Sequence, residues 1–381
     1  MSVKLNFNSN FKKNNKIRVV NLNINKIAII GLGLLGGSIA KAIKRSDSQI
    51  KVYVYDKKNV IENASNENII DFNLEKIEDA VCCDLIILCT PTELSLEIFK
   101  KLIPLLSENS IISDVCGVKG IFEKEWNKGQ NKGVYIGGHP MTGKEKGGYQ
   151  NSDPLLFENA VYIISESAKG NKRESDFLQF VKMLGARAIY LDPFLHDKVV
   201  ANVSHLPQLL SIALLNTVSS NNNKTNYLDF AAGGFKDLTR IASSDFNVWE
   251  SILKMNKFEI VETINSFQSN LDVLKKNLEF EDFLSLRSLF ENAKTNRESI
   301  AENKKGFITP LFDLFIFIND EPGILFNITK SLAKENINIK DIELQKIREN
   351  VGGTFRLSFS SLEELEKAKT TLKKSGFVIN I

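Results

Sequence analysis

The chain has 381 residues, too many for one ordinary hydrophobic core, so we expect two or three domains. Hydrophobic residues make up 43% and charged residues 25% of the sequence, the balance of a soluble globular protein, and the net charge of +3 gives no reason to expect a nucleic-acid partner. No apolar run reaches the roughly 18 residues of a membrane span, and no secretory signal is visible. The four cysteines lack zinc spacing, which favours free thiols in a cytoplasmic protein.

Residues 1–24 are rich in asparagine and lysine and contain no acidic residue, so we expect a mobile tail. From residue 26 onward, short apolar runs alternate with amphipathic stretches such as residues 94–106. This alternation predicts a Rossmann-type α/β domain over residues 25–192, with a doubly wound parallel sheet. The predicted strands are residues 26–30, 51–55, 85–89, 110–114 and 133–137, with a further pair at 160–164 and 186–191 around a helix over 174–184.

After Pro193 a 3.6-residue hydrophobic period dominates, which predicts an all-helical domain over residues 193–303. Domains of this kind often build a dimer interface. A polar linker follows at residues 301–306. The order of apolar runs over residues 307–381 then predicts a βαββα module with a last strand, a small ferredoxin-like α/β sandwich.

Three glycines in the stretch "GLGLLGGS" have G-x-G-x-x-G spacing, directly after a predicted strand and at the start of a predicted helix. They permit a tight turn, a close approach of backbone to pyrophosphate, and close packing of helix on strand. Asp56 ends the second strand, where a carboxylate binds the ribose of NAD, although two following lysines leave NADP open. The cofactor-binding residues predicted from this pattern are Gly31, Gly33, Leu34, Leu35, Gly36, Asp56, Thr90 and Pro91.

Three consecutive predicted strands end in polar or glycine-rich sequence, at residues 89–91, 113–120 and 137–149. Ligands in open sheets bind outside the carboxyl ends of the strands, so these segments should converge on one crevice. His139, in the third segment, would lie beside the nicotinamide. A histidine before a proline is in isolation more typical of a turn in which the ring bonds to backbone.

The glycine turn is followed in order by "DVCGVKG" (114–120), "HPMTGKEKGG" (139–148), "LFENA" (156–160), "HDKVVANVSHLP" (196–207) and "GFKDLTRIASSD" (234–245). Together these motifs resemble the prephenate dehydrogenase family, with agreement from about residue 25 to residue 303. Residues 315–344 resemble an ACT domain, a regulatory module that commonly binds amino acids.

The resemblance implies the oxidative decarboxylation of prephenate to 4-hydroxyphenylpyruvate with NAD⁺, a step of tyrosine biosynthesis that needs no metal. Hydride leaves the carbinol carbon of the substrate, the ring carboxylate departs as CO₂, and the ring becomes aromatic. His139 matches the family's catalytic histidine. A neutral imidazole, with an ordinary pKa near ~6.5, is suited to accept the hydrogen bond of the substrate hydroxyl.

The resemblance also implies substrate-binding roles, first of all for Arg240, whose guanidinium suits bidentate binding of a carboxylate. Each role has a structural alternative: a surface ion pair for the arginine, a solvated lysine, surface or capping acids, and core packing for the tryptophan. The substrate-binding residues so implied are Arg240, Lys236, Glu145, Gln208, Asp197 and Trp249.

The sequence departs from the family at two positions. Many members carry a serine where this chain has Gly117, and that serine shares the substrate hydroxyl with the histidine. The family often has a histidine at the position of Gln208, whose amide can bond but cannot carry charge. His205 in "SHLP" is either a helper of the site or, more typically, a buried histidine with satisfied hydrogen bonds.

The ACT-like segment predicts effector residues in two loops, at Asp320, Gly323, Asn336 and Asn338, with tyrosine or phenylalanine as the effector that feedback logic favours. A purely structural module is the alternative. The nearest alternative activity is arogenate dehydrogenase, the same chemistry on a substrate with an amine in place of the keto group. From another class comes a sensor of NAD and amino acids without turnover, which would have no need of His139 and Arg240 together.

Overall fold

The computed structural model describes residues 23–46, 49–144, 146–220, 225–299, 311–319, 321–348 and 352–380. The chain forms two compact units, Met1–Asp282 and Phe283–Ile381. Nearly all of the predicted tail, and the linker at 301–306, lie outside the described residues.

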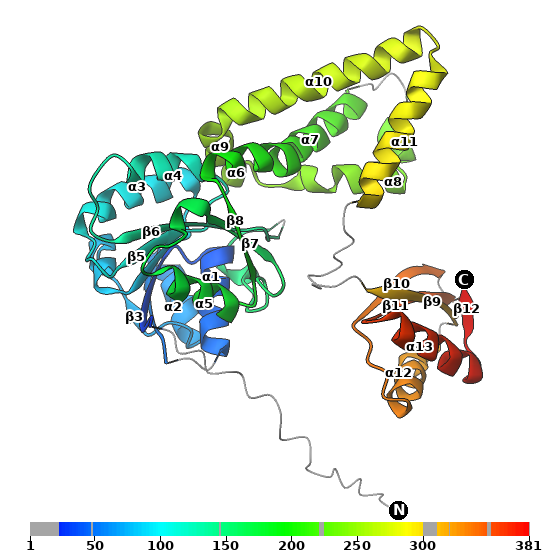
Figure 1. The fold of residues 1–381 in the computed structure, drawn as a ribbon, viewed down its shortest axis with the longest axis horizontal. Helices are drawn as coiled ribbons and strands as arrows, with labels where there is room; N and C mark the ends of the chain where they lie inside the picture. The colour runs from blue at the N-terminus through cyan, green and yellow to red at the C-terminus, as the bar shows by residue number, and fades with distance from the viewer. Residues whose placement is uncertain are drawn as a thin grey trace, which may run out of the picture. The chain divides into compact units, whose positions relative to one another are not determined.

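The first unit contains an eight-stranded sheet whose order, β3-β2-β1-β4-β5-β6-β7-β8, confirms the doubly wound prediction (Figure 1). The strands run parallel except between β6 and β7, which pair antiparallel from Gly138 to Pro140. The short β3 was not predicted, since two exposed residues carry no hydrophobic pattern. The strands are β1 Lys26–Ile30, β2 Lys51–Tyr55, β3 Phe72–Asn73, β4 Leu85–Leu88, β5 Ile111–Asp114, β6 Val134–Pro140, β7 Val161–Ser165 and β8 Arg187–Leu191.

Helices cover both faces of this sheet, and alternate residues of each strand supply the two cores. Ile27 and Ile29 pack under α1, α2 and α5, whereas Ala28 and Ile30 pack under α3 and α4 (Figure 1). The helices are α1 Leu34–Arg45, α2 Lys58–Asn66, α3 Thr92–Leu102, α4 Gly120–Trp126 and α5 Glu174–Met183.

The helical part of the first unit begins where the Asp192 carboxylate caps α6, accepting the N–H groups of Phe194 and Leu195. A π-helical turn joins α6 to α7, and turns of this kind are often found at functional sites. The elements are α6 Pro193–Val200, the π turn Ala201–His205, α7 Leu206–Ser219, η6 Tyr227–Phe230, α8 Gly233–Thr239, the 3₁₀ turn η7 Arg240–Ser243, α9 Phe246–Met255 and α10 Lys257–Glu279.

The second unit contains the predicted βαββα module and its last strand. Its four-stranded antiparallel sheet has the order β10-β11-β9-β12 and packs against two helices through a core that includes Ile316, Ile328 and Leu357. The elements are α11 Phe283–Ser299, β9 Phe312–Ile318, α12 Ile324–Lys334, β10 Asp341–Arg348, β11 Gly352–Phe359, α13 Leu362–Lys374 and β12 Val378–Asn380.

Candidate active site

The glycine turn between β1 and α1 depends on the absence of side chains at two positions. Gly31 has a φ of +98°, and a Cβ at Gly36 would lie 1.9 Å from the Gly31 carbonyl oxygen. At Gly33, by contrast, no described atom lies within 4 Å of such a Cβ. Among the described residues no side chain caps α1 either, so its first N–H groups face this open space. The turn therefore fits the pyrophosphate of a dinucleotide.

Asp56 links the end of β2 to this turn. One of its carboxylate oxygens accepts the N–H of Leu32, and the other accepts the N–H of Lys57 at 2.6 Å. At the end of β4, the Thr90 hydroxyl lies 2.8 Å from the Ser95 hydroxyl, and Pro91 directly precedes α3. The predicted cofactor residues thus lie at the carboxyl edge of the central strands.

His139 lies in the last part of β6 and is the first member of a chain of hydrogen bonds. Its Nδ1 lies 2.8 Å from Nε2 of His196, a fully buried residue in α6. His196 Nδ1 lies in turn 2.9 Å from the Asp197 carboxylate. That carboxylate also accepts the backbone N–H groups of Lys119 and Gly120, at 2.7 and 2.8 Å, where α4 begins.

The chemistry of these three groups determines where the protons are. A carboxylate only accepts hydrogen bonds, so His196 donates from Nδ1 and leaves Nε2 as an acceptor. His139 then donates from Nδ1, and its own Nε2 carries a lone pair. A Cβ at Gly117 would lie 3.8 Å from this Nε2, so the free nitrogen faces the Gly117 side of the crevice. The arrangement therefore gives His139 an unprotonated Nε2 on the side of Gly117.

The surroundings keep the histidines neutral. Burial lowers the pKa of His139 well below its ordinary range, and the nearby His196 and Lys119 lower it further. Burial also lowers the pKa of His196, although its hydrogen bond to Asp197 opposes the shift. The Lys119 ammonium is itself buried and pairs with the Asp114 carboxylate, which also accepts the Tyr135 hydroxyl at 3.0 Å.

The third histidine, His205, lies at the end of the π turn. Its Nδ1 is 3.3 Å from the Asn256 amide nitrogen, and the ring meets Trp249 edge-on with centroids 5.8 Å apart. Burial lowers the pKa of His205 to about 4. Trp249 thus packs against a buried histidine on the helical side of the site.

The predicted cations lie one helical turn apart at the end of α8. Lys236 and Arg240 are both exposed, and Arg240 opens the turn η7. The buried Gln208 of α7 donates its amide hydrogen to the Ile241 carbonyl at 2.9 Å, while its Oε1 lies 3.4 Å from the Ser244 hydroxyl. Gln208 therefore holds the turn that carries Arg240.

Two predicted site residues, Glu145 and Asp320, lie outside the described residues. Gly323, with a φ of +87°, precedes α12, whereas Asn336, with a φ of +54°, follows its C-terminal end. An 11-residue helix is about 16 Å long, so the two predicted effector loops of one chain are well separated. Asn338 is exposed near the second loop.

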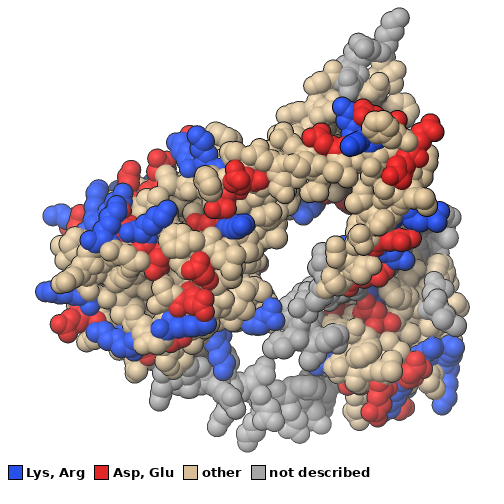
Figure 2. Space-filling model, turned by 45° about the horizontal axis from the view of Figure 1, so that its top comes forward, with Lys and Arg blue, Asp and Glu red and all other residues tan. Residues whose placement is uncertain are grey.

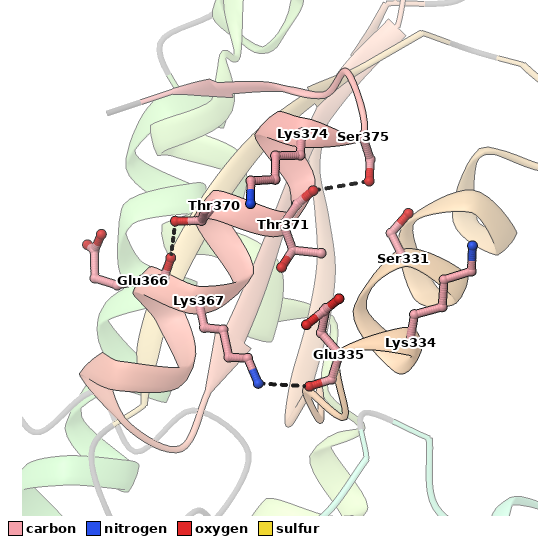
Figure 3. Close-up of a pocket in the computed structure, with 9 residues that line it drawn as sticks. All are labelled: Ser331, Lys334, Glu335, Glu366, Lys367, Thr370, Thr371, Lys374 and Ser375. Carbon is pink, nitrogen blue, oxygen red and sulfur yellow. Dashed lines mark hydrogen bonds between the residues drawn. The ribbon is translucent and has the colours of Figure 1, made fainter.

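A surface groove of about 550 Å³ between α12 and α13 contains none of the predicted effector residues (Figure 3). Its hydroxyl groups at Thr370 and Ser375 donate to carbonyls of their own helix, at 2.9 and 3.0 Å. The groove is lined by Ser331, Lys334, Glu335, Glu366, Lys367, Thr370, Thr371, Lys374 and Ser375.

The sequence did not single out His196 or Lys119, although both lie within the quoted motifs. One signal was available for His196: it is one of only three histidines in the chain and directly precedes a predicted site residue, Asp197. For Lys119 there was no comparable signal, because a lysine is ordinarily exposed and only the tertiary structure buries it against Asp114.

Three family models match the chain in succession. They describe the nucleotide-binding domain of prephenate dehydrogenase, over residues 39–190, the dimerization domain of prephenate dehydrogenase, over 192–292, and an ACT domain, over 311–381. Prephenate dehydrogenase of Lactococcus lactis is 34% identical over 356 residues, which cover 92% of this chain and 98% of that protein.

Solved structures agree with these matches. The structure of prephenate dehydrogenase from A. aeolicus in complex with hydroxyphenyl propionate and NAD⁺ has a TM-score of 0.67 at 32% identity, covering 74% of this chain and all of that one. Synechocystis arogenate dehydrogenase has a TM-score of 0.62 at 25% identity, covering 72% of this chain and 99% of that one.

Proposed function

This chain belongs to the prephenate dehydrogenase family, and we propose that it converts prephenate to 4-hydroxyphenylpyruvate by NAD⁺-dependent oxidative decarboxylation in tyrosine biosynthesis. The observation that carries the proposal is the neutral His139, with Nε2 directed to the Gly117 side of the crevice. The glycine turn opens at the same edge of the sheet and fits the dinucleotide. When bound, NAD⁺ supplies the hydride acceptor.

His139 acts as the hydrogen-bond acceptor of the substrate hydroxyl. As the carbinol carbon loses its hydride, the oxygen becomes carbonyl-like and its proton more acidic. An unprotonated Nε2 at this position takes up that developing positive charge. Since the pKa of His139 is lowered, the base is present in its active form at neutral pH.

The two carboxylates of prephenate require cations. We infer that Arg240 binds one of them through its planar guanidinium and that Lys236 contributes the second charge. The hydrogen bond from Gln208 to the Ile241 carbonyl supports this role by fixing the turn η7. Trp249 and Glu145 are proposed at the edge of the pocket. For Asp197 the buried contacts favour a role exerted through His196 over direct substrate binding.

We infer a homodimer formed by the helical region, residues 193–303. Contrary to the expectation from sequence, one described helical run, Pro193–Ser219, is long and apolar enough to span a membrane by length and composition. It carries buried polar groups whose partners lie within the protein, including Asp197. Other exposed apolar side chains of this region include Phe230 and Phe258, and a second copy would cover such a surface. These observations favour a cytoplasmic dimer.

The face shown in Figure 2 carries acidic and basic side chains side by side over the nucleotide-binding part, without a continuous basic stripe. This distribution supports a small-molecule substrate over a nucleic-acid partner. For residues 307–381 we propose a regulatory role, with tyrosine or phenylalanine as effector. Because the two candidate loops lie at opposite ends of α12, a ligand that touches both would have to bridge two copies.

Arogenate dehydrogenase is the second candidate, since an arogenate dehydrogenase is among the structural relatives. The test is an absorbance assay of NADH or NADPH formation by the full-length protein, with prephenate or arogenate, with NAD⁺ or NADP⁺, and with or without tyrosine and phenylalanine. We expect turnover of prephenate with NAD⁺. Absence of turnover on both substrates would refute the proposal.

A further inference from the structure

We propose that His196 stores the proton that His139 takes from the substrate, and returns it through the same hydrogen bond before the product leaves. The inference rests on the proposed function for the identity of the substrate. His196 is fully buried behind His139 and does not touch the substrate, so it is a positioning residue that acts through its neighbour.

The proton balance of the reaction requires a group that takes up the hydroxyl proton and later returns it. The substrate has a ring hydroxyl, and so does the product, 4-hydroxyphenylpyruvate. Oxidation removes a hydride from carbon, and CO₂ leaves without a proton. The hydroxyl proton is therefore transferred to the protein while the oxygen is carbonyl-like. It is transferred back when the electron pair of the broken C–CO₂ bond enters the ring and the oxygen becomes phenolic.

The hydrogen-bond chain provides a route for this reversible proton transfer. His139 Nε2 accepts the substrate proton, and the N–H on its Nδ1 already points to His196 Nε2 at 2.8 Å. Transfer of that second proton leaves His139 neutral and makes His196 a cation. Reversal restores both rings. Each nitrogen gains or loses one proton, so the sequence balances without another acid or base.

The charges around the pair favour His196 as the place where the cation resides. The Lys119 ammonium disfavours a cation on either ring, but only His196 has carboxylates that oppose this effect: its Nδ1 lies 2.9 Å from the Asp197 carboxylate, and Asp114 acts in the same direction. Burial of His196 also keeps the proton from exchanging with solvent during the reaction. The groups around the two rings are Asp114 and Lys119 from the β5–α4 segment, Asp197 from α6 and His205 from the π turn.

The first test does not depend on activity. The chain has three histidines, so full-length protein labelled with ¹⁵N-histidine contains only six labelled ring nitrogens. We expect both His139 and His196 to carry the proton on Nδ1 and none on Nε2, with assignment by exchanging each histidine for glutamine in turn. A proton on Nε2 of either ring would overturn the proposal, because the chain could not then pass a proton.

The second test is kinetic. His196→Gln keeps an acceptor for the His139 N–H but cannot take up a proton, so we expect kcat to fall roughly 10- to 100-fold with KM changed less than about 3-fold, and a larger solvent deuterium effect on kcat. The matched control is His205→Gln, which should keep the wild-type solvent effect. An unchanged kcat and an unchanged solvent deuterium effect in His196→Gln would refute the proposal that His196 holds the proton.

The two proposals fail in different ways. If wild-type protein produced no NADH from prephenate or arogenate, the proposed function would be wrong, and the ring-proton pattern would still decide whether the transfer chain exists. If His196→Gln did not fold, Asp197→Asn would take its place, with the same decrease of kcat expected because the stored cation loses its counter-charge.

Discussion

Gly117 leaves room beside the His139 imidazole that a side chain would partly fill. A Cβ there would lie 3.8 Å from His139 Nε2 and 3.9 Å from Ile252 Cδ1, which is ordinary van der Waals contact. Since the φ of Gly117 is not in the left-handed region, backbone strain does not require glycine at this position. The family's serine would therefore fit here, and in its absence His139 is the partner that we propose for the substrate hydroxyl.

This geometry predicts opposite results for two substitutions at Gly117. Gly117→Ser should fold normally and keep kcat/KM within about 10-fold, because its hydroxyl can share the substrate hydrogen bond. Gly117→Val should lower kcat/KM by roughly 100-fold or more, because its methyl groups would occupy the approach to Nε2. Steady-state assays with NAD⁺ test both. Equal losses in the two variants would show that the size of the side chain at this position does not control access to Nε2.

The neutral histidines also predict how stability depends on pH. All three have pKa values lowered from the unfolded value of about 6.5, that of His205 to about 4, so between the folded and unfolded values the unfolded chain binds protons that the folded chain does not. The free energy of unfolding should therefore decrease as pH falls from 7.5 to 5.5 and level off above 7.5. Urea unfolding measures it, and His205→Gln should reduce the decrease. Greater stability at pH 5.5 would contradict the assignment.

Among the elements, α7 and η7 provide the clearest case of a side chain that positions another element. Gln208 is buried, and its amide holds the Ile241 carbonyl next to Arg240. We therefore expect Gln208→Leu to raise KM for prephenate about 5- to 20-fold with a smaller change in kcat, since the cost is that of one buried hydrogen bond. Ser211→Ala is the control on the same helix. An unchanged KM in Gln208→Leu would mean that the hydrogen bond from Gln208 to the Ile241 carbonyl does not contribute to substrate binding.

The elements could largely be predicted from sequence because each has a strong local pattern. The strands at 26–30 and 85–89 are continuous apolar runs apart from Lys26, and the glycine spacing at residues 31–36 indicates the turn between strand and helix. The reversal of strand direction between β6 and β7 could not be predicted in this way, since the apolar run at 160–164 reads the same in either direction.

The candidate site was predictable only where its residues lie next to elements with a local sequence pattern. His139 and Asp56 closely follow predicted strands, so the strand topology alone places them at the crevice. His196 and Lys119 depend on the packing of α6 and α4 against the end of the sheet. Contacts between segments about 60 to 80 residues apart leave no local pattern, as the bonds from His139 to His196 and from Lys119 to Asp197 illustrate.

For the whole molecule, the exposed apolar side chains of the helical region predict a dimer with about twice the 42.8 kDa mass of the chain. Phe258 is 74% exposed, and Phe258→Asp should convert the dimer to monomer by placing a charge in the interface. Leu105→Asp, at an exposed position in the nucleotide-binding part, should leave the dimer intact. Light scattering during size exclusion measures the mass. A monomeric wild-type protein would contradict this prediction.

In the proposed reaction His139 provides the base for an NAD⁺-dependent oxidation of prephenate. The most direct test of this role compares NADH formation from prephenate by wild-type protein and by His139→Asn, with NAD⁺ affinity measured in parallel. We expect kcat to fall by about 10²- to 10⁴-fold while NAD⁺ affinity stays near the wild-type value, because the substitution removes the base and leaves the glycine turn intact. Near-normal turnover by His139→Asn would contradict this role.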